Sequence, residues 1–96
     1  MHATVAANAS IAEAEGDLQA ALGGYTDAAR RWERFGVVPE QAFALLGRGR
    51  CLLELGRPNE ASPVLLEARA IFDRLGAAPA LAEVDGLLER ATALSS

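Results

Sequence analysis

The sequence has no lysine, one histidine and one cysteine among its 96 residues. With His2 as the sole histidine, a metal site or a catalytic site built on histidine has almost nothing from which to form. Cys51 has no second cysteine for an internal disulfide, which favours a reducing, cytoplasmic location. The absence of lysine excludes a GxxxxGK[ST] phosphate-binding loop. We therefore expect a non-catalytic protein that holds neither cofactor nor metal.

The chain also lacks a basic excess and a long apolar run. Thirteen acidic residues face nine arginines, giving a formal net charge of −4, whereas nucleic-acid-binding proteins normally present a basic face. The longest uncharged stretch, residues 1–12, is too short to cross a bilayer. It also lacks the basic start and leucine-rich run of a secretory signal. We expect neither a nucleic acid nor a membrane as partner.

Helix-forming residues are abundant. The chain holds 21 alanines and 14 leucines but only ten β-branched residues, and 51% of its residues are hydrophobic. Alanine and leucine favour helices, whereas strands prefer β-branched and aromatic side chains. The apolar fraction is too high for a disordered segment. The composition therefore predicts a small all-α domain.

The sequence repeats itself at an interval of forty residues. Trp32 and Phe72 are similar residues at this interval, and eight further positions are identical. The identical pairs are Gly16/Gly56, Ala21/Ala61, Ala28/Ala68, Arg34/Arg74, Gly36/Gly76, Pro39/Pro79, Ala42/Ala82 and Arg50/Arg90.

Glycine and proline divide the chain into five predicted helices, because glycine often closes a helix and proline often begins one. In two of them the apolar residues recur in steps of three and four, which indicates one buried stripe on a helix. Pro63 is tolerated in the fourth helix if Asn59 caps that helix, because the proline then lies in the first turn. The predicted helices are Ala3–Glu15, Leu18–Phe35, Pro39–Leu55, Asn59–Leu75 and Pro79–Leu94.

Small and apolar residues recur around each glycine turn in a family-specific pattern. The first unit has Ala9, Gly16, Ala21, Tyr25 and Ala28, and the second has Gly49, Gly56, Ala61, Leu65 and Ala68. This pattern resembles the tetratricopeptide repeat. Arg48 departs from it, since it stands where the family has a large apolar residue, and must reach solvent or an acid.

The resemblance implies a single domain over residues 1–96, folded as an all-α, right-handed helical solenoid of five helices and about two and a half repeats. Repeat 1 would cover about residues 3–36 and repeat 2 about residues 39–76, with a terminal helix over about 79–94. Residues 29–91 are also similar to C-terminal repeats of large bacterial signalling proteins and transcriptional regulators. The implied function is a non-catalytic protein–protein interaction module in such a system.

The resemblance also places one face of each repeat's first helix on a concave groove that binds a peptide or helix. An apolar strip flanked by arginines suits an amphipathic helix or an acidic, apolar peptide. The alternative is that Phe43 and Leu46 belong to the core between helices. The predicted groove residues are Phe43, Leu46, Arg50, Leu53, Glu83 and Arg90, with Ala3, Ala6, Ser10 and Glu13 from the first helix and Gly86 from the last.

The last predicted helix is apolar on more than one side, which favours a second interpretation. Two and a half repeats are few for independent stability, and apolar surface at the end of a solenoid indicates a missing neighbour or a dimer. The chain would then be a homodimer or a piece of a longer array. An enzyme with an unrecognised site ranks third, since Ser10 and Cys51 lack a histidine base. The predicted self-association residues are Leu81, Val84, Leu87, Leu88 and Leu94.

Overall fold

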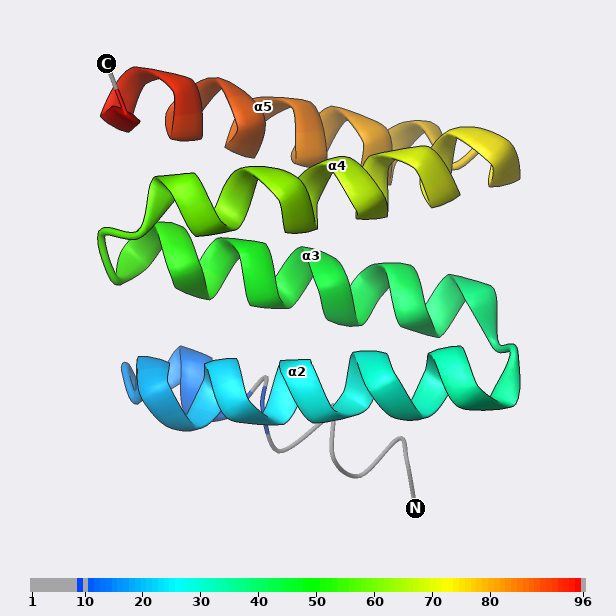
Figure 1. Ribbon diagram of the computed structural model, residues 1–96, viewed down its shortest axis with the longest axis horizontal. Coiled ribbons are helices and arrows are strands. Elements are labelled where there is room, and N and C mark those ends of the chain that lie inside the picture. The colour runs from blue at the N-terminus through cyan, green and yellow to red at the C-terminus, as the bar shows by residue number, and fades with distance from the viewer. Residues whose placement is uncertain (1–8, 10, 96) are drawn as a thin grey trace.

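The computed structural model describes Ala9 and residues 11–95, and these residues form helices joined by short turns, with no strand among them. A helical segment over residues 11–14 precedes four long helices, which run antiparallel to one another in sequence order (Figure 1). These are α2 (Leu18–Phe35), α3 (Val38–Glu54), α4 (Pro58–Leu75) and α5 (Ala78–Ser95). The predicted α2 is confirmed at both ends, and the other three helices differ from prediction by one residue at their shifted ends. Most of the predicted helix Ala3–Glu15 lies outside the described residues.

The turns confirm the role of the repeated glycines. Gly36 and Gly76 close α2 and α4 with φ of 72° and 67°, a left-handed conformation that favours glycine. One residue later, the Val37 and Ala77 amides donate to carbonyls of the last helical turn. Both turns need a residue in the left-handed conformation, which is why glycine recurs at positions 36 and 76 of the forty-residue repeat.

The start of α4 differs from prediction. Asn59 does not cap the helix, because α4 already begins at Pro58, whose ring is pre-organised for a first helical position. Pro63 therefore lies inside α4 rather than in its first turn. The Ser62 hydroxyl donates to the Pro58 carbonyl at 3.2 Å, which satisfies one carbonyl of this turn.

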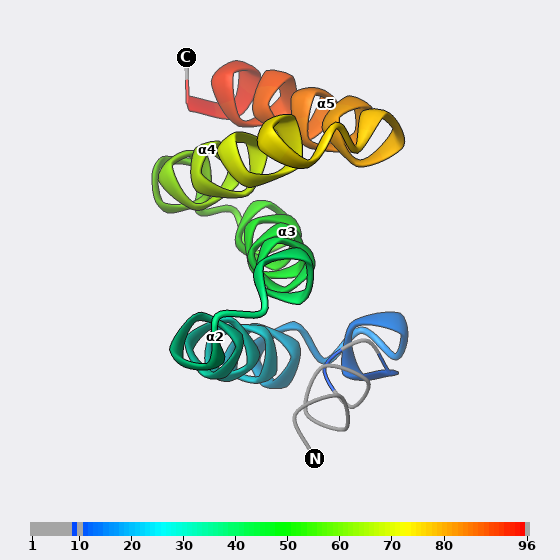
Figure 2. The ribbon, with the colours of Figure 1, turned by 90° about the vertical axis from the view of Figure 1, so that its right-hand side faces the viewer.

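The helices form a zigzag when viewed along their axes (Figure 2). α3 and α5 lie on one side together with the segment that contains residues 11–14, and α2 and α4 lie on the other side. α3 contacts α2, α4 and α5. The first helices of successive repeats therefore share one face, and the second helices share the opposite face.

Close helix packing depends on glycines of α3. A Cβ atom placed on Gly49 would lie 2.5 Å from Cδ2 of Leu65 in α4, and one on Gly47 would lie 2.5 Å from the Tyr25 ring of α2. The largest fully buried side chains lie in two clusters between the helices, with Cys51 in the cluster around Tyr25 and the other three in the larger one. They are Phe72, Leu65, Val84 and Cys51.

Arg48, which departs from the repeat pattern, is only partly covered. The side chain is half-buried, and its Nε atom is buried with no hydrogen-bond partner in the described part of the chain. Its charge lies near Glu60, where it helps to lower the pKa of that carboxyl, after the larger effect of the Arg57 hydrogen bonds. The positive charge of Arg48 thus acts on an acid in the first turn of α4.

Candidate partner-binding face

The predicted groove face is formed by residues 11–14, α3 and α5. Phe43, Arg50 and Glu54 are spaced by seven and four residues, so they lie along one side of α3. Glu83 and Arg90 are spaced by seven residues along α5. Ala3, Ala6 and Ser10, which we expected on the same face, lie outside the described residues.

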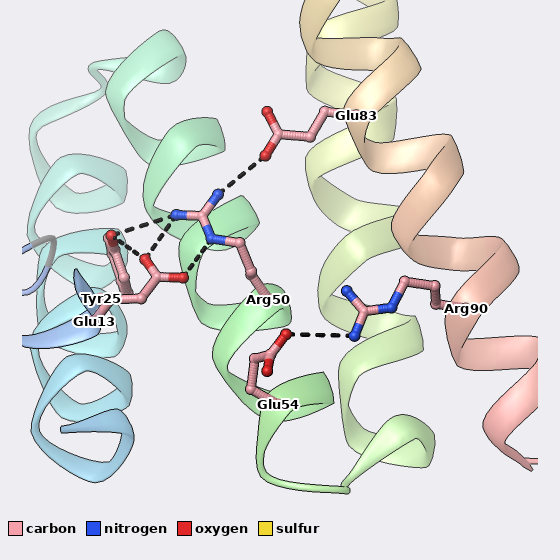
Figure 3. Close-up of polar contacts among 6 residues, drawn as sticks. All are labelled: Glu13, Tyr25, Arg50, Glu54, Glu83 and Arg90. Atoms are coloured by element: carbon pink, nitrogen blue, oxygen red, sulfur yellow. Dashed lines mark hydrogen bonds and ion pairs between the residues drawn. The ribbon is translucent and has the colours of Figure 1, made fainter. Parts of the chain in front are cut away.

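Arg50 joins three helical segments through carboxylates (Figure 3). Its Nε and Nη2 atoms donate to the two carboxylate oxygens of Glu13, and the Nη2–Oε1 distance is 2.8 Å. Its Nη1 atom donates to Oε2 of Glu83 at 3.0 Å. The Tyr25 hydroxyl donates to Oε1 of Glu13 at 2.9 Å. Each nitrogen of the Arg50 guanidinium is therefore already bound to a carboxylate of this chain.

The Arg50 contact fixes the charge state of the cluster. Its hydrogen bond lowers the pKa of the Glu13 carboxyl, although burial opposes this effect and the Tyr25 hydrogen bond adds to it. The same bond raises the pKa of Arg50. Both groups are therefore charged at neutral pH, and the pair is a charge-assisted, two-point contact of the kind that guanidinium geometry favours.

A second ion pair lies further along the same face. Nη2 of Arg90 donates to Oε1 of Glu54 at 3.3 Å, and both side chains are about half exposed (Figure 3). The face thus presents three carboxylates and two guanidinium groups, paired across successive first helices. Neither predicted arginine stands without a carboxylate neighbour, so the face is not a simple anion-binding surface.

The predicted apolar strip is reduced to Phe43. Its side chain is 56% exposed, and its ring meets that of Phe72 edge to face, with the centroids 5.0 Å apart. Leu46 and Leu53, which we also expected in the groove, are 2% and 3% exposed and belong to the core. The physical reason is that α3 is packed against three helices, so most of its surface is covered. The core interpretation therefore holds for Leu46 but not for Phe43.

The predicted self-association residues lie mostly inside the fold. Val84 and Leu87 are buried, and Leu81 and Leu88 are partly buried against the same core. Of these five residues Leu94 is exposed, with 56% of its surface accessible. Most apolar residues of α5 are therefore covered by α4 and α3, and α5 does not present the second apolar side that we expected.

The pairing of charges within the face could not be predicted from the sequence. Glu13 and Arg50 are 37 residues apart, and no periodicity indicates which charges meet across helices. The sequence gives only an indirect indication that these charges meet. Glu13, Arg50, Glu83 and Arg90 occupy first helices of successive repeats, so their proximity follows once the helices stack.

The described residues offer no site for catalytic metal chemistry. In this part of the chain, no three histidine, cysteine, aspartate or glutamate side chains are placed to hold a metal ion.

Burial, followed by the charge of Glu13, raises the pKa of the Cys51 thiol to about 11, so this thiol is protonated at neutral pH. None of the described helices is long and apolar enough to span a membrane.

The sequence is similar to one family of known proteins. A protein-family model described as tetratricopeptide repeat matches residues 2–74, which covers most of the chain. No curated protein and no solved structure matches the sequence. The match agrees with the all-α, helical-solenoid architecture.

Proposed function

Because the chain belongs to the tetratricopeptide repeat family, we propose that it binds a segment of a partner protein along the face formed by residues 11–14, α3 and α5. Repeats of this family generally mediate protein–protein interaction and are typically non-catalytic. The single observation that carries the choice of face is Phe43. Its large apolar side chain is more than half exposed, and it lies two helical turns from Arg50 along the side of α3 that carries the ion pairs.

The chemistry of the face favours an amphipathic segment over a strongly acidic one. An apolar side chain of the partner would cover Phe43, and such burial is worth about 25 cal/mol per Å². A partner carboxylate would have to displace Glu83 or Glu13 from Arg50, since both already bind that guanidinium. Exchange of one carboxylate for another gains little free energy. Polar groups that bridge the existing ion pairs suit the surface better.

The proposed setting is a cytoplasmic signalling or regulatory system of bacteria. What supports it is the similarity of residues 29–91 to C-terminal repeats of large bacterial signalling proteins and transcriptional regulators. In such a setting the module would recruit or sense a protein partner rather than transform a substrate.

The experiment is selection of peptide binders to the wild-type chain from a displayed library of amphipathic sequences. Each selected peptide is then measured against Phe43→Ser and Leu66→Ser. Phe43 and Leu66 are 56% and 55% exposed. Leu66 belongs to α4, which lies with α2 on the side of the molecule opposite α3 and α5. The two variants therefore remove similar exposed apolar area from opposite sides of the molecule.

The expected result is that Phe43→Ser weakens binding at least tenfold, the loss of an interface anchor worth about 1.4 kcal/mol or more, while Leu66→Ser leaves it unchanged. Arg90→Glu, which places two carboxylates together with Glu54, is expected to weaken the same peptides. Binders that depend on Leu66 and not on Phe43 would contradict the proposal.

A second candidate is self-association, for which Leu94 is the favouring observation. Its exposed side chain lies near the C-terminal end of α5, where it could contact a second copy. Leu94→Ser would then lower the mass of the particle in solution, measured by light scattering. We rank this candidate second because the other four apolar residues assigned to it are wholly or partly buried.

A further inference from the structure

The half of α2 that leads into α3 carries three arginines close together (Figure 1). Arg34 follows Arg30 by four residues and Arg31 by three, so it neighbours both on the helix surface. With Asp27 and Phe35 they line a surface hollow of about 420 Å³, a volume in the range of ligand-binding clefts. We call these five residues the α2 arginine patch. It belongs to a helix on the side of the molecule opposite α3 and α5.

The patch has more guanidinium groups than carboxylates. Of its five residues Asp27 is the only acid, and its carboxylate already binds Nε of Arg31 at 3.0 Å. The next acid along α2, Glu33, is held instead by a side-chain amide of α3. Arg30 and Arg34 are exposed, and neither makes a hydrogen bond or ion pair within the described chain. Two guanidinium groups are therefore available to a carboxylate from another molecule.

The internal repeat separates the structural role of Arg34 from the rest of the patch. Arg34 recurs forty residues later as Arg74, and both lie in the last turn of their helices. A cation in the last turn stabilises a helix through its dipole, and this effect falls off beyond that turn. Arg30 lies before the last turn of α2, and its counterpart in α4 is Ala70. Since like charges four residues apart oppose helix formation, the fold gives no reason for Arg30.

An apolar side chain borders the charges. Phe35 lines the same hollow and is 59% exposed. Covering this ring would contribute about 25 cal/mol per Å² of buried apolar surface. Guanidinium groups bind carboxylates through charge-assisted, two-point contacts. The patch therefore suits a ligand that combines carboxylates with a large apolar side chain.

The overall charge favours a peptide over a nucleic acid as this ligand. Thirteen acids and nine arginines give the chain a net charge of −4, so most of its surface repels a phosphate backbone. A short acidic peptide meets only the patch and its immediate surroundings, because exposed charges further away than about 10 Å are screened by salt.

We propose that the α2 arginine patch binds a short acidic segment of a partner protein, with its carboxylates on Arg30 and Arg34 and an apolar side chain against Phe35. This site is separate from the face formed by residues 11–14, α3 and α5. It also takes different chemistry, because carboxylates of the chain itself already bind Arg50 there. The inference therefore does not rest on the proposed function of that face.

Fluorescence anisotropy with a labelled synthetic peptide of repeated Asp-Asp-Leu units tests this site. A matched peptide of Asn-Asn-Leu units removes the carboxylates and keeps the leucines. The variant Arg30→Gln/Arg34→Gln removes the available guanidinium groups, and glutamine keeps the helix propensity. The control Arg69→Gln/Arg74→Gln changes the net charge equally on exposed positions of α4. Its lost Arg69–Asp85 pair is exposed and contributes little to stability.

We expect wild type to bind the aspartate peptide, and to bind it less tightly as salt is added. Arg30→Gln/Arg34→Gln should weaken this binding at least tenfold, and the α4 control by no more than about twofold. The asparagine peptide should bind at least tenfold more weakly than the aspartate peptide. Equal losses for the two variants, or no binding to wild type, would overturn the proposal.

Three further measurements separate the site from other occupants. Phe43→Ser should leave binding of the aspartate peptide unchanged, and a loss would place that peptide on the α3–α5 face instead. Tighter binding of polyuridine than of the peptide, lost in Arg30→Gln/Arg34→Gln, would identify a nucleic acid as the occupant. A wild-type dimer in light scattering that the same variant dissociates would show that a second copy covers the patch. Either of these last two results would overturn the proposal.

Discussion

At the scale of single residues, glycines inside helices have two different roles. Gly49 in α3 and Gly23 in α2 both replace better helix formers within a helix. Gly49 is required by the Leu65 side chain that packs on it. Gly23 has no atom within 4 Å of the place where a Cβ would lie. The same amino acid therefore lowers stability at one site and permits packing at the other.

Alanine substitutions should separate these two roles. We expect Gly49→Ala to destabilise the fold by about 1–3 kcal/mol, because the added methyl forces Leu65 from its position. We expect Gly23→Ala to stabilise it by about 0.5–1 kcal/mol, through helix propensity and a less flexible unfolded chain. Urea denaturation followed by circular dichroism measures both. Equal effects of the two substitutions would contradict the α3–α4 packing.

Cys51 should report on unfolding through its reactivity. The thiol is fully buried and its pKa is raised to about 11, so the reactive thiolate is scarce in the folded chain at pH 8. A disulfide reagent such as 5,5′-dithiobis(2-nitrobenzoate) should therefore label native protein far more slowly than protein in urea. Rapid labelling without denaturant would show that Cys51 is accessible and would contradict its place in the core.

At the scale of helices, their ends could be predicted from the sequence more fully than their covered faces. Glycine and proline mark the turns locally, so the bounds of α2 were found and the bounds of the other long helices shifted by only one residue. The sequence could not show that Leu46 and Leu53 point into the core and not into the groove, because α3 has apolar or small residues on most of its sides. Only the stacking of three helices around α3 shows that these leucines are covered. Periodicity likewise gave no sign that Glu13 and Glu83 would bind Arg50.

The contact between Glu13 and Arg50 should make the stability of the fold depend on pH in the acidic range. The folded chain holds the pKa of Glu13 below its ordinary value of 4.5, so this contribution to stability is present above that value. It is lost as the pH falls through the lowered pKa. We expect Glu13→Gln to reduce the melting temperature at pH 7 and to flatten its decline below pH 4.5. Glu67→Gln, at an exposed position of α4, serves as the control. Parallel pH profiles for wild type and Glu13→Gln would contradict the assignment.

At the scale of the whole molecule, the helices form a linear stack in which each contacts few others. α3 packs against α2, α4 and α5, whereas α5 packs against α4 and α3 with one side exposed. In such stacks stability is the sum of each unit and its neighbour contacts, so inner units open least. The two paired charge clusters add links between successive first helices. The face formed by residues 11–14, α3 and α5 is thus supported most firmly at α3.

Hydrogen exchange should follow this order. We expect backbone amides in the middle of α3 to exchange most slowly and those of α5 to exchange faster, because α5 can open without disturbing α2. Mass spectrometry of peptides from the two helices after exchange in heavy water gives the comparison. Slower exchange in α5 than in α3 would indicate that another surface covers α5, against the stack described above.

We propose that partners bind along the side shared by α3 and α5. The most direct test is nuclear magnetic resonance of the isotope-labelled chain during titration with a selected amphipathic peptide. We predict that the largest backbone shifts occur around Phe43, Arg50, Glu83 and Arg90. Shifts confined to α2 and the exposed side of α4 around Leu66 would show instead that partners bind the opposite side of the molecule.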